Sequence, residues 1–176
     1  MTSAMITAGA IQAISNVLAL TVDCADDVVL TTRPAYGLYK HQTELLGGTF
    51  AALPTDAASG FVPTAAALRA AFRAWDAPRT DSGLLATTTT ATRNRVRALV
   101  LCFPNNPTGA MLTKPQAQEI AAVLDEELCR HPTPGFVLVL DEVYLGICHR
   151  EFYSILQVGQ VTALDRECIE YTHDMT

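Results

Sequence analysis

The chain has 176 residues, of which 49% are hydrophobic and 7% are aromatic, and its formal net charge at pH 7 is −6. This length and apolar content suit one domain with a sizeable core, and the scarcity of aromatic residues favours an α/β sandwich over a β-sandwich. The basic residues cluster only at Arg93, Arg95 and Arg97, so the composition gives no electrostatic sign of nucleic-acid binding.

The cysteines argue against a disulfide framework and against a zinc site. Their number is odd and no Cys-x-x-Cys pair occurs, which is typical of a protein from a reducing compartment. We therefore expect a cytoplasmic protein, in which Cys102 and Cys148 are small core residues beside apolar strands. The five cysteines are Cys24, Cys102, Cys129, Cys148 and Cys168.

The apolar stretch from Ala4 to Val22 has the length of a signal peptide or a membrane span. No basic residue precedes it, because the first cation is Arg33, and Gln12, Ser15 and Asn16 interrupt it. Both features argue against a targeting segment or a membrane span. We expect a buried helix there, in a chain that has no membrane partner.

Apolar periodicity and turn residues predict alternating helices and strands through the first half of the chain. The expected elements are a helix from about Gly9, a strand over Val28–Thr32, a helix ending near Leu46, a strand over Thr49–Leu53 and a helix over Thr64–Phe72. Residues 76–95 are polar, rich in Thr and of low complexity. A flexible surface insertion is expected there, and not a domain boundary, because strands and helices alternate in the same way on both sides.

Two apolar runs in the second half predict a pair of neighbouring buried strands. Ala98–Phe103 is followed by the polar turn 105–109, and Phe136–Leu140 is followed at once by Asp141. Because α/β proteins place ligand-binding residues at the carboxyl ends of parallel strands, we expect the turn and the carboxylate to face one ligand.

The helix expected between these strands begins with a capping box. Thr113 stands at the cap and Gln116 follows three residues later, and the helix runs through about Arg130. The pattern weakens in the tail, residues 153–176, where we expect one helix near Leu164–Tyr171. The order of elements predicts a three-layer α/β sandwich, with a mostly parallel sheet covered by helices on both faces.

A second candidate binding feature is the turn of small residues at Gly9, Ala10 and Ile11, which leads into the first helix. Backbone N–H groups at a helix N-terminus have no partner within the helix, so they can bind a phosphate or a carboxylate. The same glycine would also let the helix begin close to its neighbour, and the residues alone leave both interpretations open.

Two motifs resemble the fold-type I pyridoxal-phosphate aminotransferases of the aspartate aminotransferase superfamily: FPNNPTGAM at residues 103–111, and LVLDEVY one helix later. The upstream segments ITAGAIQAI, TRPAYGLY, LGGTFAALPTD and GFVPTAAALRAAF are similar to family segments in the same order. The resemblance extends from about Thr7 to Phe152. It implies that residues 1–176 form a single, partial copy of the family's large cofactor-binding domain.

The resemblance implies roles at the ring of the cofactor, pyridoxal 5′-phosphate, for three residues. Asp141 would pair with the pyridine nitrogen and keep it protonated, so that the ring accepts electrons from a substrate carbanion. Asn106 and Tyr144 would both form hydrogen bonds to the 3′-oxygen of the ring.

The resemblance also implies that Tyr36 stacks on the cofactor ring and that Gly9, Ala10 and Ile11 bind its phosphate. Each of these residues, and each ring-binding residue, also fits an ordinary structural role taken singly, such as a turn, a helix cap or an aromatic at the core boundary. The joint occurrence of the motifs favours the cofactor site.

The chain departs from the family pattern at the catalytic lysine. Family members need a lysine that forms a Schiff base with the cofactor, and it lies downstream of the Asp-x-x-Tyr strand. The sequence has two lysines, Lys40 and Lys114, and neither matches that position. We therefore assign no catalytic residue, and we expect this chain alone to be an inactive fragment or truncated form of an aminotransferase.

For the complete enzyme, the resemblance implies exchange of an amino group between an amino acid and a 2-oxo acid, in a homodimer with sites at its interface. One alternative is a non-catalytic module that binds the cofactor or pairs with a complete subunit. Another is a Rossmann-like nucleotide-binding domain, although the Gly-x-Gly-x-x-Gly motif of that class is missing after the first strand.

Overall fold

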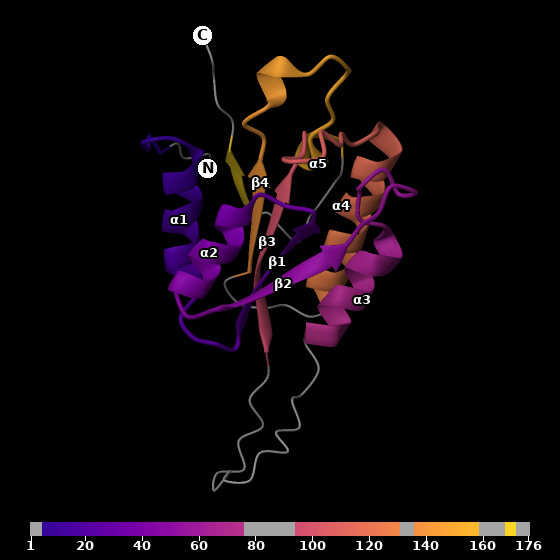
Figure 1. Cartoon of the computed structure of the whole chain (residues 1–176). Helices are drawn as coiled ribbons and strands as arrows, with labels where there is room; N and C mark the ends of the chain where they lie inside the picture. Colours follow the sequence, from indigo (N-terminus) through magenta and orange to yellow (C-terminus); the bar gives the residue numbers. More distant parts are fainter. Residues whose placement is uncertain (1–4, 76–93, 131–135, 159–167, 172–176) are drawn as a thin grey trace, which may run out of the picture.

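One parallel sheet forms the centre of the computed structural model, which describes residues 5–75, 94–130, 136–158 and 168–171 (Figure 1). Five strands pair in the order β2-β1-β3-β4-β5, and every pair is parallel. The strands are β1 (Asp27–Arg33), β2 (Thr49–Pro54), β3 (Arg95–Cys102), β4 (Val137–Asp141) and β5 (Cys168–Tyr171). The expected parallel sheet is confirmed, and so is the pairing of the two strands in the second half.

Helices cover both faces of the sheet, as the alternation of elements predicts (Figure 1). On one face lie α1 and α2, and on the other lie α3 and α4. The helices are α1 (Ala10–Thr21), α2 (Gly37–Leu45), α3 (Ala65–Trp75), α4 (Lys114–Arg130) and the short α5 (Ile155–Val158), with a 3-10 turn η1 (Leu145–Ile147) after β4. The structure is therefore a three-layer α/β sandwich.

Alternation along the central strands divides the core into two halves. Leu30 and Leu99 belong to the half that contains Leu124 of α4, whereas their neighbours Val29 and Val100 belong to the half that contains residues of α1. Successive side chains of a strand point to opposite faces, so a continuous apolar run supplies both halves at once.

The capping box at the start of α4 is present as expected. The backbone N–H of Thr113 donates to Oε1 of Gln116 over 2.9 Å, and the N–H of Gln116 donates to Oγ1 of Thr113 over 3.4 Å. These bonds satisfy donors that have no partner within the helix, and they fix the point where the chain turns from the 105–109 loop into α4.

The helix predicted to start near Gly9 does so, with Gly9 as its N-cap, but residues 5–9 of the apolar stretch lie outside it and only one of its faces is buried. It begins at Ala10, and its buried side chains, among them Ile14 and Leu18, form one face, whereas Leu20 is 85% exposed. The apolar stretch did not reveal this, because apolar residues such as Ile11 and Leu20 also occur on the exposed face of the helix. Within the described residues, no helix combines the length and the apolar character needed to cross a membrane.

The tail differs from its prediction. Residues 168–171 form strand β5 and not a helix, because they pair in parallel with β4, where Asp141 lies opposite Tyr171. This pairing between distant segments outweighs the local helical pattern. Two further elements, η1 and α5, were not predicted, and residues 164–167 of the expected helix lie outside the described part of the chain.

The expected insertion over residues 76–95 lies outside the described residues up to position 93. Arg95 was assigned to it wrongly, since this residue begins β3. Its guanidinium contacts Oδ1 of the fully buried Asp27 at 2.6 Å, and Nε of Arg97 lies 3.7 Å from the same oxygen. Two members of the basic cluster therefore have a structural partner at the amino end of the sheet.

Candidate functional site

A cavity of about 280 Å³ opens at the carboxyl ends of β1, β3 and β4. Its walls come from four separate segments: the start of α1, the start of α2, the end of β3 with its turn, and the end of β4 with the residues that follow. All seven residues predicted to bind a cofactor line this cavity, namely Gly9, Ala10, Ile11, Tyr36, Asn106, Asp141 and Tyr144. The structure thus brings together residues that are up to 135 positions apart in the sequence (positions 9 and 144).

The first wall is the N-terminus of α1. Gly9 caps this helix with φ at +84°, a conformation that disfavours residues with a Cβ, and its own N–H donates to the carbonyl of Thr7 over 2.9 Å. Ala10 and Ile11 occupy the first turn, where backbone N–H groups have no partner within the helix. These donors, at the positive end of the helix dipole, suit an anionic group such as a phosphate.

Two tyrosines of the second wall form an edge-to-face pair. Tyr36 precedes α2 and is half-buried, whereas Tyr39 lies inside the first turn of α2 and is buried. Their ring centroids are 5.9 Å apart and their planes are inclined by 81°. This contact fixes the orientation of Tyr36 at the cavity wall.

Asp141 lies on the opposite side, as the last residue of β4. Its side chain is only 5% exposed, and Oδ2 accepts a hydrogen bond from the hydroxyl of Tyr39. Oδ1 has no hydrogen-bond partner among the described residues. Burial raises the pKa of the Asp141 carboxyl, and the Tyr39 hydroxyl and the Val143 backbone N–H offset this rise only in part. A cationic group at Oδ1 would stabilise the buried charge.

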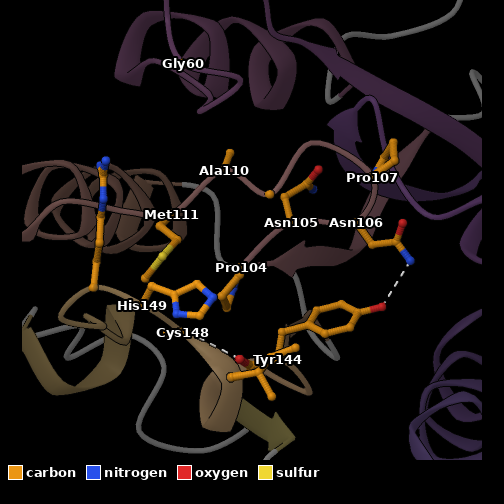
Figure 2. A pocket seen from close by; sticks show the side chains of 13 residues that line it. Gly60, Pro104, Asn105, Asn106, Pro107, Ala110, Met111, Tyr144, Cys148 and His149 are labelled. Carbon is orange, nitrogen blue, oxygen red and sulfur yellow. Dashed lines mark hydrogen bonds between the residues drawn. The ribbon is translucent and has the colours of Figure 1, made fainter.

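The Asn-Asn-Pro turn after β3 separates a structural asparagine from one that faces the cavity. Oδ1 of Asn105 accepts hydrogen bonds from the N–H and the hydroxyl of Thr108 and so organises the turn. The side chain of Asn106 instead crosses to the segment after β4, and its Nδ2 donates to the hydroxyl of Tyr144 over 3.1 Å (Figure 2). An amide and a phenol are therefore held side by side, and both can bind one ligand oxygen.

Among the lining residues that sequence reasoning did not assign to this cavity, Tyr39 and Cys102 lie against Asp141. Tyr39 stands three residues after Tyr36, one helical turn away, and that spacing was a usable signal. Cys102 pairs with Asp141 in the β3–β4 register, so its buried thiol lies beside the carboxylate. Burial and the charge of Asp141 raise the pKa of the Cys102 thiol to about 11.

Neither lysine lines the cavity. Lys40 is exposed on α2, where Nζ lies 3.7 Å from Oε1 of Glu44, and Lys114 is exposed at the start of α4. Both lysines thus lie outside this cavity, and the statement that neither one is the reactive lysine stays a prediction.

Comparison with known proteins places the chain in a family. The sequence model of the family described as aminotransferase class I and II matches residues 2–170. A putative aminotransferase of Bacillus subtilis, YugH, is 27% identical over 152 residues, which cover 86% of this chain and 32% of that protein. A probable aspartate/prephenate aminotransferase of Thermus aquaticus is 30% identical over 140 residues, covering 80% of this chain and 29% of that protein.

Solved structures agree with the sequence comparison. An aspartate aminotransferase of Thermus thermophilus, solved with maleate, superposes with a TM-score of 0.69 at 25% identity, covering 96% of this chain and 36% of that one. The chain thus spans about a third of the length of the relatives that it matches. Because the family model covers nearly the whole sequence, this chain belongs to the class I and II aminotransferase family.

Proposed function

We propose that this chain forms part of the cofactor-binding domain of an aminotransferase and binds pyridoxal 5′-phosphate in the cavity described above. Members of the family use this cofactor. The observation that carries the proposal is the pair of opposite charges across the cavity: a helix N-terminus with unpaired N–H groups at one side, and the buried Asp141 with a free oxygen at the other.

The residues present fit the groups of this cofactor. The N–H groups of Ala10 and Ile11 would bind the phosphate, and the Asn106–Tyr144 pair would bind the ring oxygen. Tyr36 would cover one face of the ring. The unpaired Oδ1 of Asp141 would hold a proton on the ring nitrogen, because the carboxylate loses its burial penalty when it pairs with a cation.

When bound, pyridoxal phosphate supplies an electron sink for the carbanion that forms on an amino-acid substrate. This chain would orient the ring, and Asp141 would keep the ring nitrogen protonated. The Tyr39 hydroxyl holds the Asp141 carboxylate in place by donating a hydrogen bond to it. We propose that the complete protein exchanges amino groups between amino acids and 2-oxo acids as a homodimer. The lysine required for that reaction is not supplied by Lys40 or Lys114, so these 176 residues alone bind the cofactor reversibly and do not transaminate.

Cofactor binding to the purified chain tests the proposal. We expect pyridoxal phosphate to bind reversibly, as measured by its absorbance and by calorimetry. Asp141→Ala should weaken binding by about 10- to 100-fold, since a hydrogen bond to a charged group is lost. The matched control is Glu119→Gln, which removes an exposed negative charge on α4 and should leave affinity unchanged.

Reduction with borohydride tests the second part. Mass spectrometry should find no stoichiometric adduct at Lys40 or Lys114 after reduction. A specific adduct at either lysine would contradict the assignment, and so would an Asp141→Ala variant with undiminished affinity.

A further inference from the structure

The side chain of Gln42 joins the two helices that cover one face of the sheet. Its Nε2 donates a hydrogen bond to the backbone carbonyl of Ile11 over 3.2 Å, and both residues line the cavity of about 280 Å³ (the first cavity). Gln42 lies on α2 and Ile11 in the first turn of α1, two helices that Figure 1 shows side by side. The proposed function assigns no role to this contact.

The first turn of α1 has little other support. Ile11 is 47% exposed, Gln12 is exposed, and the buried side chains of the helix begin only at Ala13. Among the described residues, Gln42 makes the only side-chain hydrogen bond that another element contributes to this turn. Because helix ends open at little cost when nothing holds them, the order of the turn depends on Gln42.

The same turn carries the N–H groups that the proposed function assigns to a phosphate. The N–H groups of Ala10, Ile11 and Gln12 make no hydrogen bond to any described residue. They point to one anion only while the turn is helical. A turn that becomes ordered only on binding lowers the affinity, so a turn that is fixed in advance favours the anion.

One helix contacts both ends of the first cavity. Gln42 follows Tyr39 by three residues, so the two side chains lie on one side of α2. The hydroxyl of Tyr39 donates to Oδ2 of Asp141, whose side chain is 5% exposed and whose Oδ1 has no hydrogen-bond partner among the described residues. Helix α2 thus holds the carboxylate end through Tyr39 and the N–H end through Gln42.

We propose that Gln42 is a positioning residue that makes the first cavity select ligands carrying a phosphate. It acts by holding the first turn of α1 against α2, and the proposal rests on the proposed function. Loss of the hydrogen bond weakens a phosphorylated ligand. It leaves the unphosphorylated counterpart unaffected, because the ring would contact Asn106, Tyr144 and Asp141, away from the turn.

The variant Gln42→Met removes the hydrogen bond and keeps the length of the side chain. Oε1 of Gln42 is buried and has no hydrogen-bond partner among the described residues, so the substitution also removes an unsatisfied oxygen. These two effects oppose each other, and we expect urea unfolding of the variant to match that of the parent. The matched control is Gln118→Met, at an exposed position on α4.

Hydrogen exchange of the ligand-free chain tests the contact itself. The N–H groups of residues 13–15 bond to carbonyls of the first turn, as the N–H of Ala13 does to Gly9 over 3.5 Å. In Gln42→Met these groups should exchange about 2- to 10-fold faster, the effect of one lost hydrogen bond. Gln118→Met should exchange like the parent. Unchanged exchange in Gln42→Met would overturn the proposal.

Calorimetry with pyridoxine 5′-phosphate and pyridoxine tests the selectivity. The two probes differ only in the phosphate, and neither carries an aldehyde that reacts with lysine. Gln42→Met should weaken pyridoxine 5′-phosphate about 2- to 10-fold and leave pyridoxine unchanged, whereas Gln118→Met should change neither. An equal loss for both probes would show a general structural defect and overturn the proposal, and so would no loss for the phosphate.

Failure of the proposed function would look different. Asp141→Ala should weaken both probes, since it removes a contact to the ring. If binding of pyridoxine 5′-phosphate depends on Gln42 but not on Asp141, the role of Gln42 stands and the proposed function falls. If Asp141→Ala weakens both probes and Gln42→Met weakens neither, the proposed function stands and the role of Gln42 falls.

Discussion

The hydroxyl of Tyr39, in the first turn of α2, donates a hydrogen bond to Oδ2 of Asp141, the last residue of β4 and 102 positions further along the chain. This bond joins a helix on one face of the sheet to the strand end that carries the carboxylate. It leaves Oδ1 of Asp141 as the oxygen available to a ligand. One carboxylate oxygen thus accepts a hydrogen bond from α2, and the other has no hydrogen-bond partner among the described residues.

Removing the Tyr39 hydroxyl should destabilise the chain. In Tyr39→Phe, Oδ2 of the buried carboxylate loses its donor, and the free energy of unfolding should fall by about 1–3 kcal/mol. Tyr36→Phe is the matched control, because no hydrogen bond of the Tyr36 hydroxyl is found within the described residues and its ring contact with Tyr39 is kept. Urea unfolding at pH 7 measures both, and equal stability of the two variants would refute the structural role of the bond.

The pKa of Asp141 predicts a pH-dependent effect on stability. Burial raises this pKa in the folded chain, so the folded state holds the proton more tightly than the unfolded state does. The stabilising contribution of the protonated carboxyl is therefore present at low pH and is lost as the pH rises above about 4. Asp141→Asn carries no charge at any pH, so it should be more stable than the parent at pH 7, with the difference shrinking toward pH 3.5.

Urea unfolding at both pH values, without cofactor, checks this expectation. Glu119→Gln, at an exposed position, controls for the change in net charge. A variant less stable than the parent at pH 7 would show that the ionised carboxylate stabilises the fold.

Thiol reactivity should separate the cysteines. With a pKa of about 11, Cys102 has a thiolate fraction of about one in a thousand at pH 8, and its side chain is buried. Cys24 and Cys129 are exposed. Iodoacetamide should therefore modify these two well before Cys102, as mass spectrometry of the peptides would show. Rapid modification of Cys102 in the folded chain would contradict the described cavity.

Gly109 should resist substitution in the turn after β3. Its φ is +68°, and its N–H donates to the carbonyl of Asn105 over 2.7 Å. Nothing lies within 4 Å of an added Cβ, so the cost of Gly109→Ala is conformational, about 1–2 kcal/mol. Gly37→Ala, which also has open space but needs no positive φ, should keep or raise stability in thermal unfolding.

Much of the fold was predictable because its signals are local. The apolar runs before Asn105 and Asp141 identify buried parallel strands, and the Thr113–Gln116 capping box marks the start of α4. Strand β5 was not predictable from local pattern, because four residues become a strand only through pairing with β4. The half-exposed face of α1 was missed for a similar reason, since burial depends on what packs against the helix.

Motif resemblance predicted seven of the residues that line the first cavity, but it did not predict the residues that lie against Asp141. Tyr39 and Cys102 contact Asp141 only because α2 crosses the sheet and because β3 and β4 pair in one register. The sequence separation of these residues from Asp141 predicts neither contact. A neighbouring cavity of about 840 Å³ was missed entirely, since Arg150 and His149, which line it, belong to no recognised motif.

The first cavity draws its walls from four stretches of chain, beginning near residue 8 and ending at residue 144. These stretches meet only after β1 has paired with β3 and β3 with β4, contacts that join segments about 40 to 70 residues apart. No partly folded intermediate that lacks one of these pairings contains a complete cavity. A ligand in this cavity therefore binds only the chain whose sheet is fully formed. Increasing the ligand concentration should raise the temperature at which the whole chain unfolds in one cooperative step.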